Sequence, residues 1–448
     1  MKVICDDNRV RLYPSDWRYS AAIVGLVRYF KYNSFEYITA DDYIEYNREF
    51  VYDEEAYLSF TERFFCNKMH HLQILALLDK DDLSESEEKE CNEKLQANAI
   101  CKKVFGKTKY SIENKTIIAN YIAQNRMILI KETFRNGKTM FTKFINESKL
   151  FSDNGEVCRL NGYYVDTGRK TKSIAYKWDK STFVHEDERE FDFIPFAFTK
   201  TRESFFVNNN ITINSLLRAN NNLLESLNNA DEVDSYPRKN LFLQYANATS
   251  MSKTCIDYDA ELITIKQDMG YYETTFVRRK ALQIFKALSE KEYQVLLTRL
   301  KINDNYINIE EYVVNSILNY IHLDDLIERA MKHAGTNTIR NGILIKINAL
   351  IYGGEDMDEK IHSARNCAYA VKRNLESNKL KSYRQKLLSA ITFKNYDRFC
   401  QILLQLSDYS GVIFNFAYDL FEDFEANKNV AYAFVNGLNE SDYNGGNK

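Results

Sequence analysis

The segment FDFIPFAFTKTRESFFVNNN, residues 191–210, is the most distinctive stretch of this chain. Its first half places phenylalanine at positions 191, 193, 196 and 198, and this alternation predicts a half-buried β-strand. Pro195 interrupts the run, so we expect the strand to lie at a sheet edge or to bend there. A cationic group follows, then a second apolar group, and then a run of carboxamides: Lys200, Thr201, Arg202, Asn208, Asn209 and Asn210.

Two interpretations of this segment remain open from the residues alone. A rigid aromatic strand that ends in cations and carboxamides suits a loop that presents hydrogen-bond donors to a polyanion. Arginine and lysine contact guanine edges or phosphates, and asparagine contacts adenine or sugar edges. The alternative is a strand, a solvated turn and a second strand, with the asparagines present because they adopt turn conformations readily.

The composition is that of a globular protein with much helix. The chain has 448 residues, of which 45% are hydrophobic and 27% charged, and it is long enough for two or three domains. Only 3 Pro and 15 Gly are present, which favours long helices over a loop-rich sandwich. The eight cysteines are scattered, no signal peptide pattern precedes them, and the apolar runs are shorter than a membrane span. We therefore expect a cytoplasmic protein with reduced thiols and no membrane partner.

The first part of the chain mixes short strands and helices. Ser15 is expected to cap a helix over residues 17–30, in which Gly25 indicates a close packing contact. Further helices are predicted over 54–78, 115–130 and 214–229, and short strands over 2–4, 241–245 and 262–266. The acidic run at 79–90 is expected to be a solvated linker or an exposed helix.

Two positions resemble half of a zinc knuckle. Cys101 and Cys158 each begin a C-x-x-C-G pattern in which the second cysteine is replaced, by Val104 and Asn161 respectively. A structural zinc ion needs four ligands, and no nearby histidine completes the set. We predict no bound metal and no cofactor. A compact basic turn at 169–172 follows two tyrosines, which suits phosphate contact and base stacking as well as it suits a solvated hairpin tip.

From about Leu282 onward the pattern is continuously helical. Ten basic residues lie between Lys360 and Arg398, opposed only by Glu376 and Asp397. One strongly basic helical face is a suitable track for a nucleic-acid backbone, although a solvated helix face is the alternative. The residues that we single out are Arg365, Lys372, Arg373, Lys379 and Arg384.

No enzyme signature is present. The chain lacks a phosphate-binding glycine loop and the motifs G-x-G-x-x-G, H-E-x-x-H and G-x-S-x-G, and its six histidines are scattered. Acidic residues are plentiful, so a metal-dependent nuclease stays open as an alternative function. The pattern favours a binding protein that is not an enzyme.

Several stretches together resemble the large subunits of type I CRISPR surveillance complexes (Cascade), most closely the CXXC–CXXC group associated with subtypes I-A and I-B. These stretches are SDWRYSAAIVGLVRYF (15–30), the central segment at 191–210, KLLSAITFKNYDRFCQILLQL (386–406) and AYAFVNGL (431–438). The resemblance spans nearly the whole chain. It implies that the half-knuckles are eroded forms of that group's paired CXXC motifs, within a degenerate zinc-ribbon-like region at about 101–172.

The resemblance also implies an architecture and a function. The expected fold class is α+β: a mixed α/β body over residues 1–281 with short strands, followed by an all-α helical bundle over 282–448 that is similar to the Cascade small subunit. Such a subunit does no chemistry; it reads the protospacer-adjacent motif in double-stranded DNA, helps to open the duplex and recruits the nuclease–helicase. Its partners would be the guide crRNA, target DNA, and the backbone and small subunits of Cascade.

We assign the roles that the resemblance implies to two groups of residues: the polar residues of the 191–210 segment and the basic residues between Lys360 and Arg398. Motif reading or duplex wedging would be carried by Lys200, Arg202, Asn208, Asn209 and Asn210, and the basic helices would contact the displaced strand. The second interpretation is a helical scaffold with no nucleic-acid role, whose basic face docks an acidic protein. Nucleic-acid binding would weaken steeply with salt, which separates the two.

Overall fold

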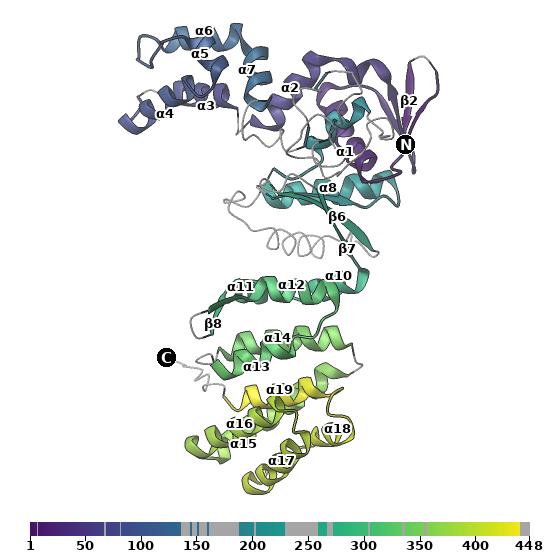
Figure 1. The fold of residues 1–448 in the computed structure, drawn as a ribbon, viewed down its shortest axis with the longest axis vertical. Helices are drawn as coiled ribbons and strands as arrows, with labels where there is room; N and C mark the ends of the chain where they lie inside the picture. The colour runs from purple at the N-terminus through teal and green to yellow at the C-terminus, as the bar shows by residue number, and fades with distance from the viewer. Residues whose placement is uncertain are drawn as a thin grey trace, which may run out of the picture. The chain divides into compact units, whose positions relative to one another are not determined.

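The computed structural model describes residues 1–6, 8–66, 69–80, 82–135, 144–145, 150–151, 159–160, 188–200, 203–228, 259–266, 272–302, 305–333, 337–353 and 356–439. These residues form two compact units. Unit 1 comprises the described residues up to 276, and unit 2 comprises those from 277 to 439. Figure 1 shows the elements of each unit.

Unit 1 combines short strands with helices. Its elements are β1 (Lys2–Ile4), β2 (Arg9–Leu12), α1 (Trp17–Asn33), β3 (Tyr37–Thr39), β4 (Ile44–Asn47), η1 (Arg48–Tyr52), α2 (Glu54–Phe64), α3 (His70–Leu78), α4 (Glu85–Leu95), α5 (Ala99–Phe105), α6 (Lys115–Gln124), α7 (Arg126–Arg135), η5 (Arg189–Phe196), β5 (Glu203–Asn208), α8 (Ile213–Asn228), β6 (Ala260–Lys266) and β7 (Tyr272–Val277).

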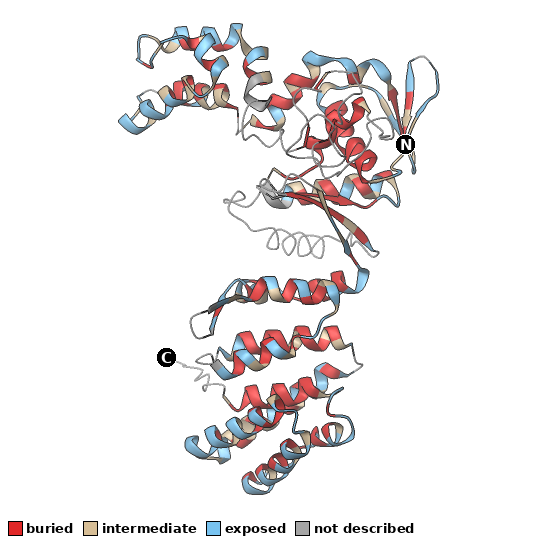
Figure 2. Cartoon of the chain, viewed as in Figure 1, coloured by how far each residue is buried: buried red, intermediate tan, exposed pale blue. Residues whose placement is uncertain are grey.

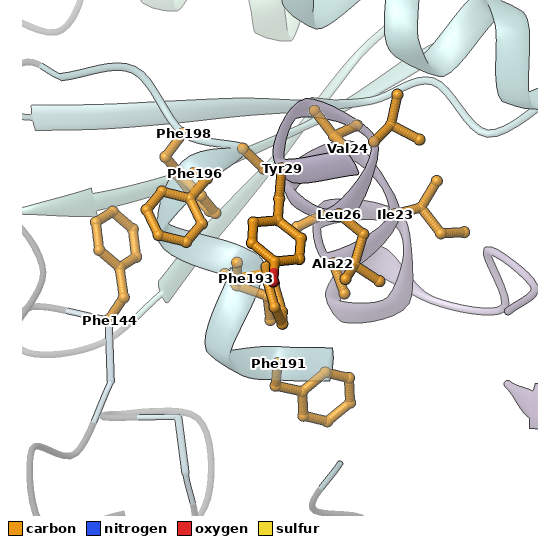
Figure 3. Close-up of a cluster of buried hydrophobic side chains, with 14 of the residues drawn as sticks. Ala22, Ile23, Val24, Leu26, Tyr29, Phe144, Phe191, Phe193, Phe196 and Phe198 are labelled. Carbon is orange, nitrogen blue, oxygen red and sulfur yellow. The ribbon is translucent and has the colours of Figure 1, made fainter. Parts of the chain in front are cut away.

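The core of unit 1 lies between α1 and the 3-10 helix η5. α1 is buried along nearly its whole length, and its rings and aliphatic side chains meet those of η5, as Figure 3 shows. The ring centroids of Tyr29 and Phe193 are 4.9 Å apart. A Cβ on Gly25 would lie 2.0 Å from the Phe193 carbonyl oxygen, so only glycine permits this approach. The close packing contact predicted at Gly25 is therefore confirmed, and it joins α1 to the 191–210 segment.

The strand predicted over 191–198 is wrong, because residues 189–196 form η5. The alternation of phenylalanines was misleading because every residue from 189 to 199 is buried, so the small residues between the rings do not mark a solvated face. Asp192, in the middle of the helix, has partners for both its side chain and its backbone carbonyl. The Asp192 carboxylate lies 2.9 Å from Arg159 Nη1, and the Tyr57 hydroxyl donates to the Asp192 carbonyl at 2.7 Å.

Two sheets border this core. The first has strand order β1-β2-β4-β3, and its β2–β4 pairing is antiparallel with Val10 opposite Tyr46. The second has order β5-β6-β7, with β5 and β6 antiparallel and Phe206 opposite Ile263. The predicted strands at 2–4 and 262–266 are confirmed, whereas the one at 241–245 lies outside the described residues.

The helices α3 to α7 pack around a separate hydrophobic cluster. Glu62 on α2 joins this group to the rest of unit 1, because His71 Nε2 on α3 lies 2.7 Å from Glu62 Oε1 and Arg126 Nε on α7 donates to Glu62 Oε2 at 2.9 Å. The second half of the acidic run forms the exposed start of α4, where Ser84 and Glu87 form a capping box. Of the two possibilities for this run, the exposed helix is confirmed from residue 85 onward.

Unit 2 is mainly helical. Its elements are α10 (Arg279–Lys286), α11 (Glu290–Leu296), β8 (Arg299–Ile302), β9 (Asn305–Asn308), α12 (Ile309–Asn319), α13 (Asp324–His333), α14 (Thr338–Tyr352), α15 (Met357–Asn374), α16 (Ser377–Thr392), α17 (Tyr396–Ser410), α18 (Ala417–Glu422) and α19 (Lys428–Gly437).

The centre of unit 2 is formed by α14 and α19, which are largely buried, whereas α16 and α17 expose much of their surface (Figure 2). Buried asparagines connect the two central helices. Asn341 Nδ2 donates to Asn436 Oδ1 at 3.3 Å, and Asn348 Nδ2 donates to Asn429 Oδ1 at 2.8 Å. These amide pairs set the register of α14 against α19, since a shift would leave buried polar groups without partners.

The α+β fold class predicted from the sequence is confirmed, with strands and helices in unit 1 and a helical region from α13 to α18. One detail differs. Residues 299–308, predicted as helix, contain the antiparallel pair β8–β9, in which Ile302 lies opposite Asn305. In the part of the chain that the structure describes, no helix has the length and apolar character needed to cross a membrane.

Candidate nucleic-acid interface

Lys200 lies four residues after the end of η5 and is only partly exposed. Its ammonium nitrogen lies 4.4 Å from the centroid of the Phe64 ring, at the end of α2, so the lysine stem packs on an aromatic face. Burial lowers the pKa of Lys200, and the nearby cations Arg28 and Arg63 lower it further. A cation held among other cations is a suitable partner for a phosphate. Arg202, predicted to act beside it, lies outside the described residues.

The three asparagines are not displayed on one loop. Asn208 ends strand β5 and is 8% exposed, and its amide nitrogen donates to Glu261 Oε2 at 2.6 Å. Asn209 is 3% exposed and donates to the Ser215 carbonyl at 3.5 Å. Asn210 is exposed, with its amide 3.2 Å from the Pro14 carbonyl. The expectation that all three present donors outward is corrected for Asn208 and Asn209, which are buried; contact between Asn210 and DNA stays a prediction.

The cations of α15 and α16 also divide into two groups. Arg365 is directed toward α14, since a Cβ on Gly342 would lie 3.1 Å from Arg365 Nη2. Arg384 Nη2 donates to the Met331 carbonyl at 3.1 Å, near the end of α13, and burial lowers the pKa of Arg384. Arg384 therefore bonds α16 to the end of α13, and the Arg365 side chain packs against α14. Lys372 is half-buried at the end of α15, and Arg373 beside it is exposed.

The remaining cations gather on α16. This helix has no acidic residue between Ser377 and Thr392, and it exposes Lys379, Lys381 and Lys386. Lys379 Nζ donates to the Tyr409 hydroxyl of α17 and lies 4.9 Å from the centroid of that ring. This hydrogen bond raises the pKa of Lys379.

Two tyrosines lie among these lysines. Lys386 Nζ lies 5.7 Å from the centroid of the Tyr383 ring, and the ring centroids of Tyr383 and Tyr409 are 6.3 Å apart. Tyr409 is 52% exposed. We call this surface the α16–α17 face, defined by Lys379, Lys381, Tyr383, Lys386 and Tyr409. Cations that follow a backbone and aromatic rings that stack on bases are the features by which proteins hold single strands.

A comparison with known families identifies the group to which this chain is related. A family model described as CRISPR-associated protein Csx8 matches residues 9–250 and 230–438. The chain belongs to the Csx8 family of CRISPR-associated proteins. No curated protein and no solved structure matches it.

Membership of the Csx8 family confirms the coarser part of the resemblance that the sequence indicated, which is association with CRISPR. A protein of this family has partners within a CRISPR system. The family match says nothing about the large-subunit role or about the link to the CXXC–CXXC group.

The Csx8-family chain holds Cys101 within helix α5, where it is 1% exposed and its backbone N–H donates to Asn98 Oδ1 at 2.8 Å. Burial raises the pKa of this thiol, which disfavours the thiolate that a metal requires. Cys158 lies outside the described residues. Within the described ranges, no group of three or more histidine, cysteine, aspartate or glutamate side chains is placed to hold a metal ion.

Sequence reasoning missed Tyr383 and Tyr409. Tyr383 has a signal in the sequence, since it is interleaved with basic residues in the run from Lys379 to Lys386. Tyr409 has none, because its place beside Lys379 depends on how α17 packs against α16.

Proposed function

We propose that this protein is the non-catalytic large subunit of a type I CRISPR RNA-guided surveillance complex. In this role it recognises the protospacer-adjacent motif in double-stranded DNA, aids duplex opening and recruits the nuclease–helicase. The observation that carries the proposal is the α16–α17 face, a cationic and aromatic surface in a chain whose family is CRISPR-associated.

The α16–α17 face suits the displaced single strand better than it suits a duplex. Exposed Lys381 and Lys386 would contact phosphates, which attract cations without regard to sequence. Tyr383 and Tyr409 offer ring faces to unpaired bases, whereas the bases of an intact duplex are stacked on one another and not accessible to them.

Motif recognition would belong to unit 1. Lys200 and Arg202 remain the cations that we assign to the flanking motif, with Asn210, beyond β5, as the exposed carboxamide. Asn208 and Asn209 would support this region from within: their amides bond to Glu261 on β6 and to Ser215 on α8. Guide pairing would supply the rest of the sequence specificity.

The test is assembly of the full chain with its neighbouring CRISPR proteins and guide RNA, followed by binding to target duplexes that carry a randomised flank. We expect a two- or three-base flank to be enriched only when this chain is present, and the enrichment to disappear in Lys200→Ala and Arg202→Ala. Equal binding of every flank with and without the chain would contradict the motif-reading role.

A second candidate is a helical scaffold with no nucleic-acid role. It is favoured by Arg365 and Arg384, two of the predicted DNA-contacting residues, because both are engaged within unit 2. A scaffold of this kind would dock an acidic protein through its basic face. Removing the charge of the α16–α17 face would then weaken binding to that protein, and the chain would bind no nucleic acid with or without the charge.

A further inference from the structure

One face of α15 lines a groove that the nucleic-acid proposal does not use. The opposite face of the helix is packed: Ile361, Ala364, Ala368 and Val371 are buried. The open face carries Ser363, Cys367 and Ala370 at helical spacing. Together with Val412 from the segment after α17, these residues line a wide, open groove of about 670 Å³. Small side chains along the floor allow another backbone to approach α15 closely.

The wall of this groove is held in place by internal bonds. Gly411 ends α17 with φ at +67°, a left-handed conformation that turns the chain back. The Ser407 hydroxyl donates to the Val412 carbonyl at 2.6 Å, and Cys367 Sγ lies 3.8 Å from the Ile413 carbonyl oxygen. The groove is therefore preformed, which lowers the entropic cost of binding a partner.

An exposed apolar side chain and two carboxylates mark the edges of the groove. Ile413 is 77% exposed beside Val412. Asp358 and Glu359 line the end nearest the start of α15, both are exposed, and neither forms an ion pair with any residue that the structure describes. Lys360 in the same turn is already neutralised, since its Nζ lies 2.8 Å from Asp419 of α18.

The charge of this groove is opposite to that of the α16–α17 face. Carboxylates repel phosphates, so a nucleic acid is disfavoured here, whereas lysine or arginine side chains on a partner would be attracted. A row of small residues with an apolar edge is the surface that an amphipathic helix covers. Shape and charge together identify one kind of occupant.

We propose that this groove docks a basic amphipathic helix of a protein partner within the CRISPR complex. The lysine or arginine side chains of that helix would lie opposite Asp358 and Glu359. Its apolar side chains would cover Ile413 and the floor formed by Ser363, Cys367 and Ala370. This inference does not depend on nucleic-acid binding by the α16–α17 face.

The first test locates the occupant directly. A photo-crosslinking amino acid replaces Asn366, which is exposed and lines the groove, in the full chain assembled with guide RNA and the other proteins of its CRISPR system. We expect crosslinks to one protein segment with lysine or arginine at helical spacing. The same crosslinker at Ser382, an exposed position of α16, is the matched control and should report a different neighbour. Crosslinks from position 366 to nucleic acid, to an acidic segment or to nothing would overturn the proposal.

The second test removes the charge and keeps the side-chain size. The double variant Asp358→Asn with Glu359→Gln should weaken association with that protein by about tenfold, because two attractive contacts at the edge are lost, and leave single-stranded DNA binding unchanged. Both carboxylates also stabilise the first turn of α15, so the control must remove comparable groups. Glu376→Gln with Asp397→Asn does so at the starts of α16 and α17. If the control pair weakens association with the protein partner equally, the effect is one of helix stability, and the proposal is wrong.

Discussion

Gly25 shows how one residue sets the distance between two elements. The missing side chain allows the Phe193 carbonyl to approach α1 so closely that an added Cβ would stand 2.0 Å from its oxygen. The obstacle is backbone, which cannot rotate away as the end of a long side chain can. The position of η5, and with it the phenylalanine cluster of Figure 3, therefore depends on this glycine.

We expect Gly25→Ala to destabilise unit 1 by about 1–3 kcal/mol, the usual cost of overpacking, with a matching fall in the urea midpoint. Gly342→Ala is the control, because its new methyl group would meet only the flexible end of Arg365, at 3.1 Å. Alanine is also the better helix former, so the control should be neutral or stabilising. An unchanged midpoint for Gly25→Ala would mean that α1 and η5 separate without cost.

The ionisation of Glu62 leads to a second prediction about a single side chain, which concerns how the stability of unit 1 depends on pH. Burial disfavours its ionised form, but the hydrogen bonds with His71 and Arg126 outweigh burial and lower the pKa of Glu62 below its usual value of 4.5. Its contribution to the stability of unit 1 is thus fully present above pH 4.5 and is lost as the pH falls through the lower folded-state pKa.

We expect Glu62→Gln to cost about 1–3 kcal/mol at pH 7, because it removes the charge that the buried His71 ring and Arg126 contact. The gap between wild type and variant should narrow as the pH falls below 4.5. Urea denaturation at pH 7 and at several values between 5 and 3 measures this. A gap that stays constant over the whole range would show that the carboxylate charge is irrelevant.

At the scale of elements, α16 combines two functions on one helix. Arg384 and the apolar side chains face α13 and α17, and the lysines face solvent with tyrosines among them. A solvated helix usually carries both positive and negative side chains. The absence of carboxylates from α16 therefore calls for a functional explanation. Binding to a phosphate backbone supplies one.

We expect Lys381→Glu with Lys386→Glu to weaken single-stranded DNA binding and to reduce the slope of log Kobs against log salt by about 1.4, from two lost phosphate contacts at roughly 0.7 each. Lys291→Glu with Lys301→Glu, two exposed lysines elsewhere in unit 2, makes the same charge change as a control. If both pairs reduce the slope equally, the effect is one of overall charge, and the helical scaffold becomes the better account.

On the scale of the whole molecule, the two units present different chemistry. Unit 1 holds partly buried Lys200 near other cations at the end of an aromatic core. Unit 2 presents a cationic, aromatic face on α16 and α17 and an acidic groove on α15. This division suits a subunit that contacts nucleic acid and proteins at the same time, which is what the proposed place in a CRISPR complex requires.

Patterns in the amino-acid sequence were enough to predict the fold class, the helices with a clear apolar period, the close approach at Gly25 and the CRISPR association. These follow from patterns that neighbouring residues carry: periodicity, glycine in a helix, and stretches shared with a family. Periodicity failed at residues 191–198, because a fully buried segment has no polar face to reveal its geometry.

Which polar and charged side chains can reach a binding partner depends on how the helices and strands pack. Asn208, Asn209, Arg365 and Arg384 look like the other candidates in sequence, but packing brings an acceptor or a neighbouring helix to each of them. Packing also brings Tyr409 to Lys379, which lies 30 residues away along the chain. A side chain's availability depends on partners that are distant in sequence, and those partners are set by how the helices pack.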